Sequence, residues 1–164
     1  MSDDVSNAKS LSMIVTKGTL DWAYPPFILA TTAAAMGLNV SMFFTFYGLE
    51  LLKKELNLSV GTLGNAAMRM PMMGMHMAMP NLVAALPFAT AGTTAMMKNL
   101  IAGKQIASID ELRETAIESE VELVACQMTM GMFEIKKEEL IDVPVGGAAT
   151  YIETATKSDI NLFI

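Results

Sequence analysis

Cysteine, histidine and charged residues are scarce in this chain, and each scarcity excludes a class of function. Among 164 residues there is one cysteine, Cys126, and one histidine, His76. A single cysteine excludes an intrachain disulfide framework, a cysteine-based metal cluster and any redox mechanism with a resolving cysteine in the same chain. Charged residues make up 17% of the sequence and the formal net charge is -6. Because phosphate binding needs clustered Lys and Arg, no nucleic-acid partner is expected.

Several enzyme motifs and targeting signals are also missing. The chain has no G-x-G-x-x-G fingerprint after its first predicted strand, no P-loop and no G-x-S-x-G turn, so no cofactor is expected. The polar N-terminus, MSDDVSNAKS, lacks the basic and apolar regions of a signal peptide. A lone free cysteine fits a reducing compartment, and we expect a cytoplasmic protein.

Apolar residues are abundant instead. They make up 52% of the sequence, which is hard to bury within one monomer of this size. We therefore expect an oligomer interface, a partner or a membrane surface to take the surplus. Residues 22–49 and 70–97 contain no Asp, Glu, Lys or Arg and are long enough to cross a bilayer. Pro and Gly interrupt both stretches, which makes membrane association the less favoured alternative.

The order of predicted elements indicates one α/β domain over residues 1–164, with a flexible N-terminus at 1–9. Apolar β-rich runs predict strands, and amphipathic or capped segments predict helices. The predicted strands are 11–18, 39–48, 121–126 and 160–164, and the predicted helices are 24–37, 49–56, 91–103, 108–120, 136–141 and 146–156. A short strand between the last two helices completes the order. This alternation predicts a mostly parallel sheet with helices on both faces. We interpret the acidic run at 110–122 as a solvated helix face.

Residues 68–79, MRMPMMGMHMAM, contain seven methionines and fit no single periodicity. Met75, His76 and Met77 offer soft ligands of the kind that bind Cu(I), so a metal site is an alternative hypothesis. We favour packing or an interface, because Met fills irregular gaps without a fixed geometry. No metal site is therefore predicted.

Cys126 has an informative position at the end of the predicted strand 121–126. Ligands of open α/β sheets bind outside the carboxyl ends of the strands, where the turns at 17–22 and 45–48 also lie, so we expect these turns to converge on Cys126. A thiol at such a place can ionise and react, but most free cysteines are small buried packing residues. The residues alone support both interpretations. Asp21 likewise either caps the next helix or orients a ligand.

The segment around Cys126 has a specific pattern: a strand, then A-C-x-M-[ST]-M, then a short K-x-E-E-L helix. Further distinctive stretches run nearly from end to end: KGTLDWAYPPFILATTAAAMG, VSMFFTFYGLELLKK, MPNL, SIDELRETA, VELVACQMTMGMFEIKKEELI, GGAATYIETA and NLFI. Together they resemble the DsrE/DsrF-like family, in particular a sulfur-metabolism branch often labelled peroxiredoxin-like. That label does not by itself imply peroxidase activity.

The resemblance implies a three-layer α/β/α fold, homo-oligomers, and a sulfurtransferase or sulfur carrier that works with rhodanese-like or TusA-like partners. The family's reactive cysteine maps onto Cys126. Some relatives carry a second cysteine a few residues downstream, where this chain has Met130, Met132, Phe133 and Glu134, which leaves a single-cysteine mechanism. Some relatives are anchored in membranes through apolar helices in the middle of the chain, where this sequence has its Met-rich segment.

From the residues and the resemblance together we predict a sulfur carrier rather than a true turnover enzyme. Cys126 would hold sulfane sulfur as a persulfide or thiosulfonate and pass it to a partner thiol. Met128 would help to shield the sulfur, Thr129 would donate a hydrogen bond, and backbone amides near Gly146 and Gly147 would steady the anion. The full set of candidate binding residues is Thr19, Asp21, Met128, Thr129, Gly146 and Gly147. The alternatives are an oligomeric binding or scaffold protein with a structural cysteine, and a metal-binding protein that uses the Met-rich segment.

Overall fold

The computed structural model describes residues 9–62, 69–72, 75–78, 82, 85–86 and 88–164, and the chain divides into two compact units. The first unit comprises Met1–Gly18, Trp22–Leu56 and Ile109–Ile164, and the second comprises Thr19–Asp21 and Asn57–Ser108. The single domain predicted for the chain stays a prediction. The predicted flexibility of residues 1–9 falls, apart from Lys9, outside the described residues.

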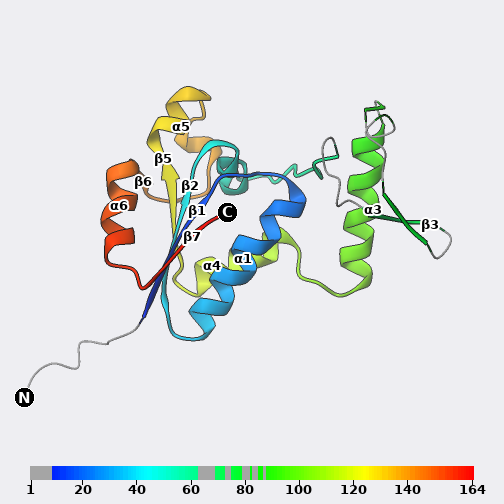
Figure 1. Ribbon diagram of the computed structural model, residues 1–164. Coiled ribbons are helices and arrows are strands. Elements are labelled where there is room, and N and C mark those ends of the chain that lie inside the picture. Colours follow the sequence, from blue (N-terminus) through cyan, green and yellow to red (C-terminus); the bar gives the residue numbers. More distant parts are fainter. Residues whose placement is uncertain (1–8, 63–68, 73–74, 79–81, 83–84, 87) are drawn as a thin grey trace, which may run out of the picture. The chain divides into compact units, whose positions relative to one another are not determined.

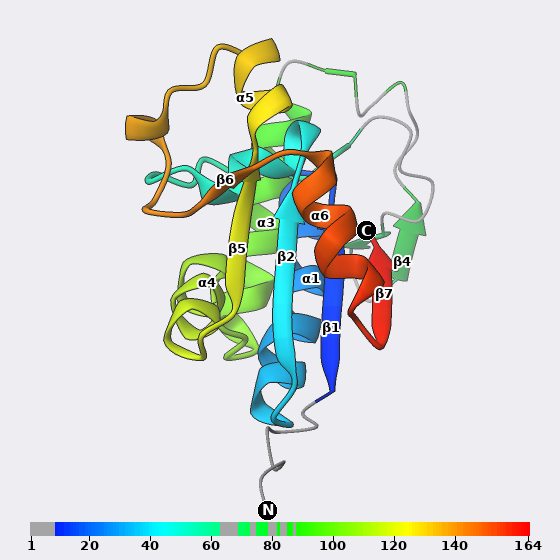
Figure 2. The same cartoon turned by 90° about the vertical axis from the view of Figure 1, so that its left-hand side faces the viewer.

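A five-stranded sheet forms the centre of the first unit (Figures 1 and 2). Its strands are β1 (Ser10–Val15), β2 (Asn39–Phe44), β5 (Glu122–Cys126), β6 (Val145–Gly146) and β7 (Ile160–Phe163), in the spatial order β6-β5-β2-β1-β7. Every neighbouring pair is parallel. Four of these strands match the predicted ones with shorter bounds. The fifth, β6, has only two residues and corresponds to the short strand expected between the last two predicted helices.

Helices cover both faces of this sheet. The helices of the first unit are α1 (Leu20–Ala35), η1 (Phe46–Leu52), α4 (Ile109–Glu118), α5 (Gln127–Met132), η2 (Lys137–Glu139) and α6 (Ala148–Thr156), of which η1 and η2 are 3-10 helices. The first two residues of α1 are grouped with the second unit. Figure 1 shows α1 and α4 on one face and α6 on the other. The rings of Phe27 on α1 and Phe44 lie 6.0 Å apart, and those of Tyr151 on α6 and Phe43 lie 5.5 Å apart. Since Phe43 and Phe44 are consecutive residues of β2 and point to opposite faces, the predicted three-layer α/β/α fold is confirmed.

Helix α1 begins one turn earlier than the sequence predicts. Pro25 and Pro26 therefore lie inside the helix and not in its first turn. The start is fixed by a distant contact, in which the backbone N–H of Leu20 donates to the carbonyl oxygen of Ser59 at 2.9 Å. Local sequence does not reveal such a contact, whereas proline in a first turn is the common arrangement.

The 3-10 helix η1 stands where the sequence predicts a short α-helix at 49–56. Its start passes very close to β1, because a Cβ atom at Gly48 would lie 2.2 Å from the carbonyl oxygen of Val15. Its far end is held by the buried Arg113 of α4, whose guanidinium donates to the carbonyl oxygens of Leu51 at 3.1 Å and Lys53 at 2.6 Å. These two contacts leave little room for a wider helix.

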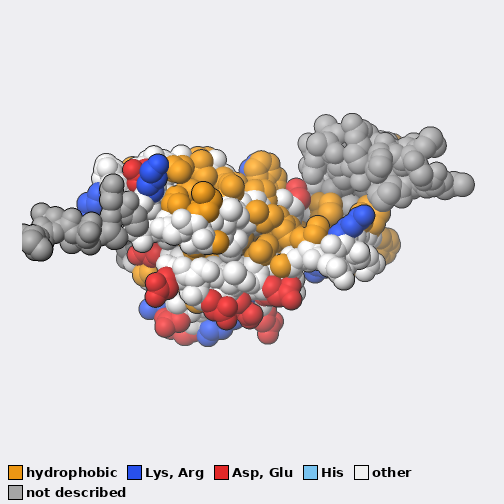
Figure 3. Space-filling view, turned by 90° about the horizontal axis from the view of Figure 1, so that it is seen from below, with side chains coloured by type: hydrophobic (Ala, Val, Ile, Leu, Met, Phe, Trp, Pro, Cys, Tyr) orange, Lys and Arg blue, Asp and Glu red, His pale blue; other side chains and the backbone are white. Residues whose placement is uncertain are grey.

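The acidic run at 110–122 is exposed, as predicted for a solvated face. Its exposed acidic residues are Asp110, Glu111, Glu114, Glu118, Glu120 and Glu122. In Figure 3, most of the acidic side chains in view gather along its lower part. The interpretation of this run as a solvated surface is confirmed.

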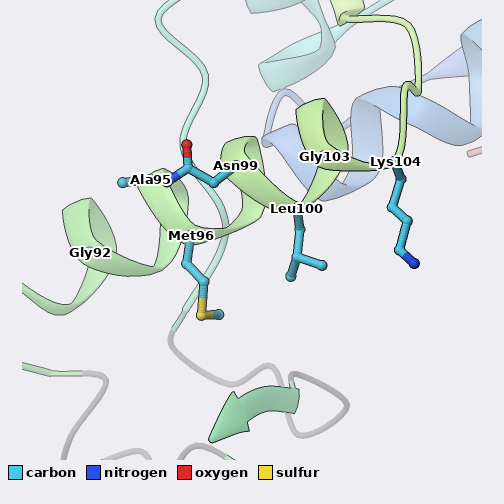
Figure 4. Close-up of a pocket in the computed structure, with 7 residues that line it drawn as sticks. All are labelled: Gly92, Ala95, Met96, Asn99, Leu100, Gly103 and Lys104. Carbon is cyan, nitrogen blue, oxygen red and sulfur yellow. The ribbon is translucent and has the colours of Figure 1, made fainter.

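The second unit contains α3 (Ala89–Gly103) and a two-stranded antiparallel sheet of β3 (Arg69–Met72) and β4 (Met75–Ala78). The sequence predicts no regular structure for the Met-rich segment, so these two strands are a difference. Residues 73–74, between them, lie outside the described residues. Along α3 runs an open hollow of about 640 Å³, lined by Gly92, Ala95, Met96, Asn99, Leu100, Gly103 and Lys104 (Figure 4). In the described part of the chain no helix is both long and apolar enough to cross a membrane.

Candidate functional site

Three parallel strands end side by side around Cys126. In the register of the sheet, Ala125 pairs with Phe44 of β2, and Cys126 pairs with Gly146 of β6. Thr45 is the next residue after Phe44, so it occupies the end of β2 beside Cys126. The thiol is therefore at the carboxyl edge of the sheet, between β2 and β6, as its sequence position predicts.

Cys126 is buried, with 3% of its surface exposed. Helix α5 begins at the next residue and brings Thr129 back towards the end of β2. Thr129 is fully buried. Its hydroxyl oxygen lies 3.0 Å from the hydroxyl oxygen of Thr45 and accepts a hydrogen bond from the backbone N–H of Phe46 at 3.1 Å. Two hydroxyls from elements distant in sequence thus meet beside the thiol.

The pKa of the Cys126 thiol lies below its ordinary value. Burial raises this pKa, but the hydrogen-bond donors around the sulfur together outweigh burial: the hydroxyl and N–H of Thr129, the hydroxyl of Thr45 and the N–H of Met128. The sulfur does not form a regular side-chain cap of α5. Burial among apolar groups alone would suppress ionisation of a thiol. A buried thiol whose surroundings favour the thiolate is characteristic of reactive cysteines.

The turn after β2 lies beside the thiol, as predicted, because the hydroxyl of Thr45 donates to the sulfur. The first residues of the turn after β1 approach this second turn closely. A Cβ atom at Gly18 would lie 2.1 Å from the carbonyl oxygen of Tyr47, so only glycine allows the two turns this approach. Phe46 has a positive φ of 49°, a left-handed conformation that costs free energy for a residue other than glycine. This conformation accompanies the hydrogen bond from its N–H to Thr129.

An apolar surface adjoins this region. The rings of Tyr47 and Phe133 stack with centroids 5.6 Å apart. Met128 exposes 68% of its surface, and Met132 and Phe46 are also exposed. The backbone N–H of Met128 is one of the donors to the sulfur, whereas the residue as a whole is exposed. The predicted shielding of the sulfur by Met128 stays a prediction.

The remaining candidate residues are placed as follows. Gly146 pairs with Cys126 across the sheet, and Gly147 caps the start of α6. Thr19 and Asp21 belong to the second unit, where the carboxylate of Asp21 accepts a hydrogen bond from the N–H of Gly61 at 3.3 Å. The ligand role of these residues stays a prediction.

The alternative metal site involves Met75, His76 and Met77, which lie on β4, and their side chains fall outside the described part of the structure. Among the described residues no group of three His, Cys, Asp or Glu side chains is placed to hold a metal ion. The copper hypothesis stays untested.

Sequence reasoning missed Thr45 and Phe46 as individual site residues. The turn that contains them was among the segments expected to converge, and a hydroxyl residue directly after a buried strand is a signal for Thr45. No local pattern signals the left-handed backbone of Phe46.

Comparisons with known proteins show which family the chain belongs to. The model of the DsrE/DsrF/DrsH-like family matches residues 7–163. The chain is 56% identical over 157 residues to "Sulfur carrier protein DsrE2" of Allochromatium vinosum, a match that covers 95% of this chain and 98% of that protein. It is 33% identical over 159 residues to "Uncharacterized protein YrkE" of Bacillus subtilis, covering 95% and 97%. The chain therefore belongs to the DsrE/DsrF/DrsH-like family.

Proposed function

We propose that this protein is a sulfur carrier that holds sulfane sulfur on Cys126 as a persulfide or thiosulfonate and passes it to a partner thiol. The main support for the proposal is the environment of the Cys126 thiol. The thiol is buried, yet hydrogen-bond donors around it favour its thiolate form. The name of the relative with 56% identity, a sulfur carrier protein, supports the same role.

Each step of the proposed transfer exchanges one S–S bond for another. In loading, the Cys126 thiolate attacks the outer sulfur of a donor persulfide. A new S–S bond forms at Cys126, the donor's S–S bond breaks, and the donor's inner sulfur leaves as a thiolate. In release, an acceptor thiolate attacks the outer sulfur of the Cys126 persulfide, and Cys126 leaves as a thiolate. A thiosulfonate forms on Cys126 when the thiolate attacks an inner sulfur of tetrathionate, the central S–S bond breaks and thiosulfate leaves. None of these steps consumes an oxidant or a reductant other than the donor itself.

The proposal includes partners and assembly. A TusA-like or rhodanese-like relay protein would supply or accept the sulfur in the cytoplasm, and the chain would act as a homo-oligomer. The exposed Phe46, Tyr47, Met128 and Met132 support a protein partner, because apolar and aromatic side chains gathered near a reactive group are typical of contact surfaces.

One observation favours a second candidate, a binding or scaffold protein with a structural cysteine. Cys126 exposes only 3% of its surface, as most packing cysteines do. This candidate predicts that the thiol forms no adduct with sulfur donors under native conditions.

Intact-protein mass spectrometry separates the two candidates. Wild-type protein and Cys126→Ser are incubated with polysulfide, thiosulfate or tetrathionate, and with a persulfidated rhodanese as a protein donor. The proposal expects an added sulfur or thiosulfonate group on wild type and none on Cys126→Ser. If wild-type protein gains no adduct from any of these donors, the carrier proposal is refuted and the scaffold candidate is favoured.

A further inference from the structure

Thr45 follows the end of β2, whose last residue pairs with Ala125, and Thr129 lies on α5, three residues beyond Cys126. The hydroxyls of both lower the pKa of the thiol. Their oxygen atoms lie 3.0 Å apart, so they share one hydrogen bond. The backbone N–H of Phe46 donates to Thr129 at 3.1 Å and fills one of its lone pairs. The backbone of Thr45 is itself held by β1, because its N–H donates to the carbonyl oxygen of Val15 at 3.0 Å.

The two hydroxyls carry two protons between them, and the use of these protons changes with the charge on the sulfur. Each threonine hydroxyl has one proton and two lone pairs. While the two hydroxyls bond to each other, one proton is used between them and the other remains for the sulfur, whichever of the two donates. When charge develops on the sulfur, both protons can turn to it, because Thr129 keeps its hydrogen bond from Phe46. The number of donors to the sulfur therefore rises with the charge on it.

We propose that Thr45 acts with Thr129 as a hydrogen-bond donor to the Cys126 sulfur when Cys126 gives up its outer sulfur, so that the site favours release of sulfur over its uptake. The inference rests on the proposed carrier function and adds a direction to it. Thr45 is a residue that neither the sequence pattern nor the family match assigns to the site.

The location of the charge in the two half-reactions explains the direction. In the loaded protein the negative charge lies on the outer sulfur, about 2.05 Å beyond the Cys126 sulfur. Release returns the charge to the Cys126 sulfur, where the two hydroxyls stabilise it and make Cys126 a better leaving group. Uptake removes the charge from the same atom, so the hydroxyls lower the nucleophilicity of the thiolate once it has formed.

The test compares wild type with Thr45→Val, which keeps the branched shape and removes the hydroxyl, and with Thr45→Ser, which keeps the hydroxyl. Thr115→Val is the matched control, because the exposed hydroxyl of Thr115 donates within α4, to the carbonyl of Glu111 at 2.8 Å. Thiolate formation is followed by absorbance at 240 nm, and Cys126→Ser provides the tyrosine background. Loading is measured with inorganic polysulfide and mass spectrometry. Release is measured as thiocyanate formed with cyanide, at cyanide concentrations where the rate is proportional to cyanide.

Thr45→Val is expected to raise the pKa of the thiol. At a pH where the thiol of every variant is ionised, Thr45→Val should take up sulfur about 3- to 10-fold faster and release it about 3- to 10-fold slower. This size is expected because one hydrogen bond to a charged sulfur is lost and part of its free energy is felt in the transition state. Thr45→Ser and Thr115→Val should resemble wild type.

Two results would overturn the inference: both half-reactions changing in the same direction in Thr45→Val, or Thr45→Ser behaving like Thr45→Val. Either would mean that Thr45 acts through packing alone. Failure of the proposed function looks different, because wild type would then form no persulfide at all. In that case the titration at 240 nm still shows whether Thr45 donates to the thiolate. If the pKa of the thiol in Thr45→Val equals that of wild type, Thr45 is not a donor to the thiolate.

Discussion

Replacing Arg113 by Met should destabilise the protein far more than its ion pair with Asp110 suggests. Only 6% of the surface of Arg113 is exposed, and its guanidinium donates to the carbonyl oxygens of Leu51 and Lys53 as well as to the carboxylate of Asp110 at 3.1 Å. Burial lowers the pKa of Arg113, which shows that the charge is held at some cost in solvation. The stabilising contribution must therefore come from the carbonyl groups that the guanidinium satisfies.

The magnitude follows from these contacts. Asp110 exposes 60% of its side chain, and an ion pair so exposed contributes about 0–1 kcal/mol. A carbonyl deprived of its donor costs about 1–3 kcal/mol, and there are two of them. Relief from burying the charge offsets part of this cost. Arg113→Met should therefore lower the free energy of unfolding by about 2–4 kcal/mol, and Asp110→Asn by less than about 1 kcal/mol.

Urea denaturation followed by circular dichroism at 222 nm measures both variants against wild type. Arg113→Lys is the informative third variant, because a single ammonium cannot match the planar fork of guanidinium donors, and it should fall between wild type and Arg113→Met. The reasoning is refuted if Arg113→Met stays within about 0.5 kcal/mol of wild type, a change typical of surface substitutions, or if Asp110→Asn costs as much as Arg113→Met.

Two further predictions concern the sheet edge. Gly48→Ala should strongly reduce the thermal unfolding midpoint or prevent folding, because its Cβ would lie 2.2 Å from the carbonyl oxygen of Val15. Gly131→Ala is the control: its Cβ would have nothing within 4 Å, so its midpoint should stay close to that of wild type. Equal midpoints for the two variants would contradict the close approach of Gly48 to Val15. The lowered pKa of Cys126 means that the unfolded chain binds more protons than the folded one between the two pKa values. The stability that the thiol contributes is therefore fully present above the ordinary pKa of about 8.5 and is lost as the pH falls through the folded pKa. Unfolding free energies of wild type and Cys126→Ser, measured from pH 6 to 9.5, should diverge as the pH rises, and a constant difference would speak against the lowered pKa.

The central strands and the convergence of their turns could be predicted because both depend on general rules. Continuous apolar runs such as those of β2 and β5 signal strands that are buried on both faces. In a parallel sheet, residues at the carboxyl ends of the strands share one edge. The position of Cys126 at the end of a predicted strand therefore already placed it at this edge. Thr129 was also within reach, because it lies only three residues beyond Cys126.

Features set by distant contacts could not be predicted. Thr45 and Thr129 are 84 residues apart, and their pairing follows from the neighbouring positions of β2 and β5, which the sequence does not specify. The start of α1 depends on the carbonyl of Ser59, and the narrow form of η1 depends on the approach of Gly48 to β1. In each case a long-range backbone contact overrides the local signal from proline or from an amphipathic pattern.

The 3% exposure of Cys126 also has a kinetic consequence for any acceptor. A molecule in solution meets the sulfur only during brief local opening of the segments around it, and such openings have their own rate and free energy. At low acceptor concentration the transfer rate should increase with the acceptor's reactivity. At high concentration it should level off at the opening rate, and that plateau should be the same for acceptors of different nucleophilicity. A partner protein that held the segments apart would raise the plateau itself, so a physiological acceptor should exceed the limit that every small thiol obeys.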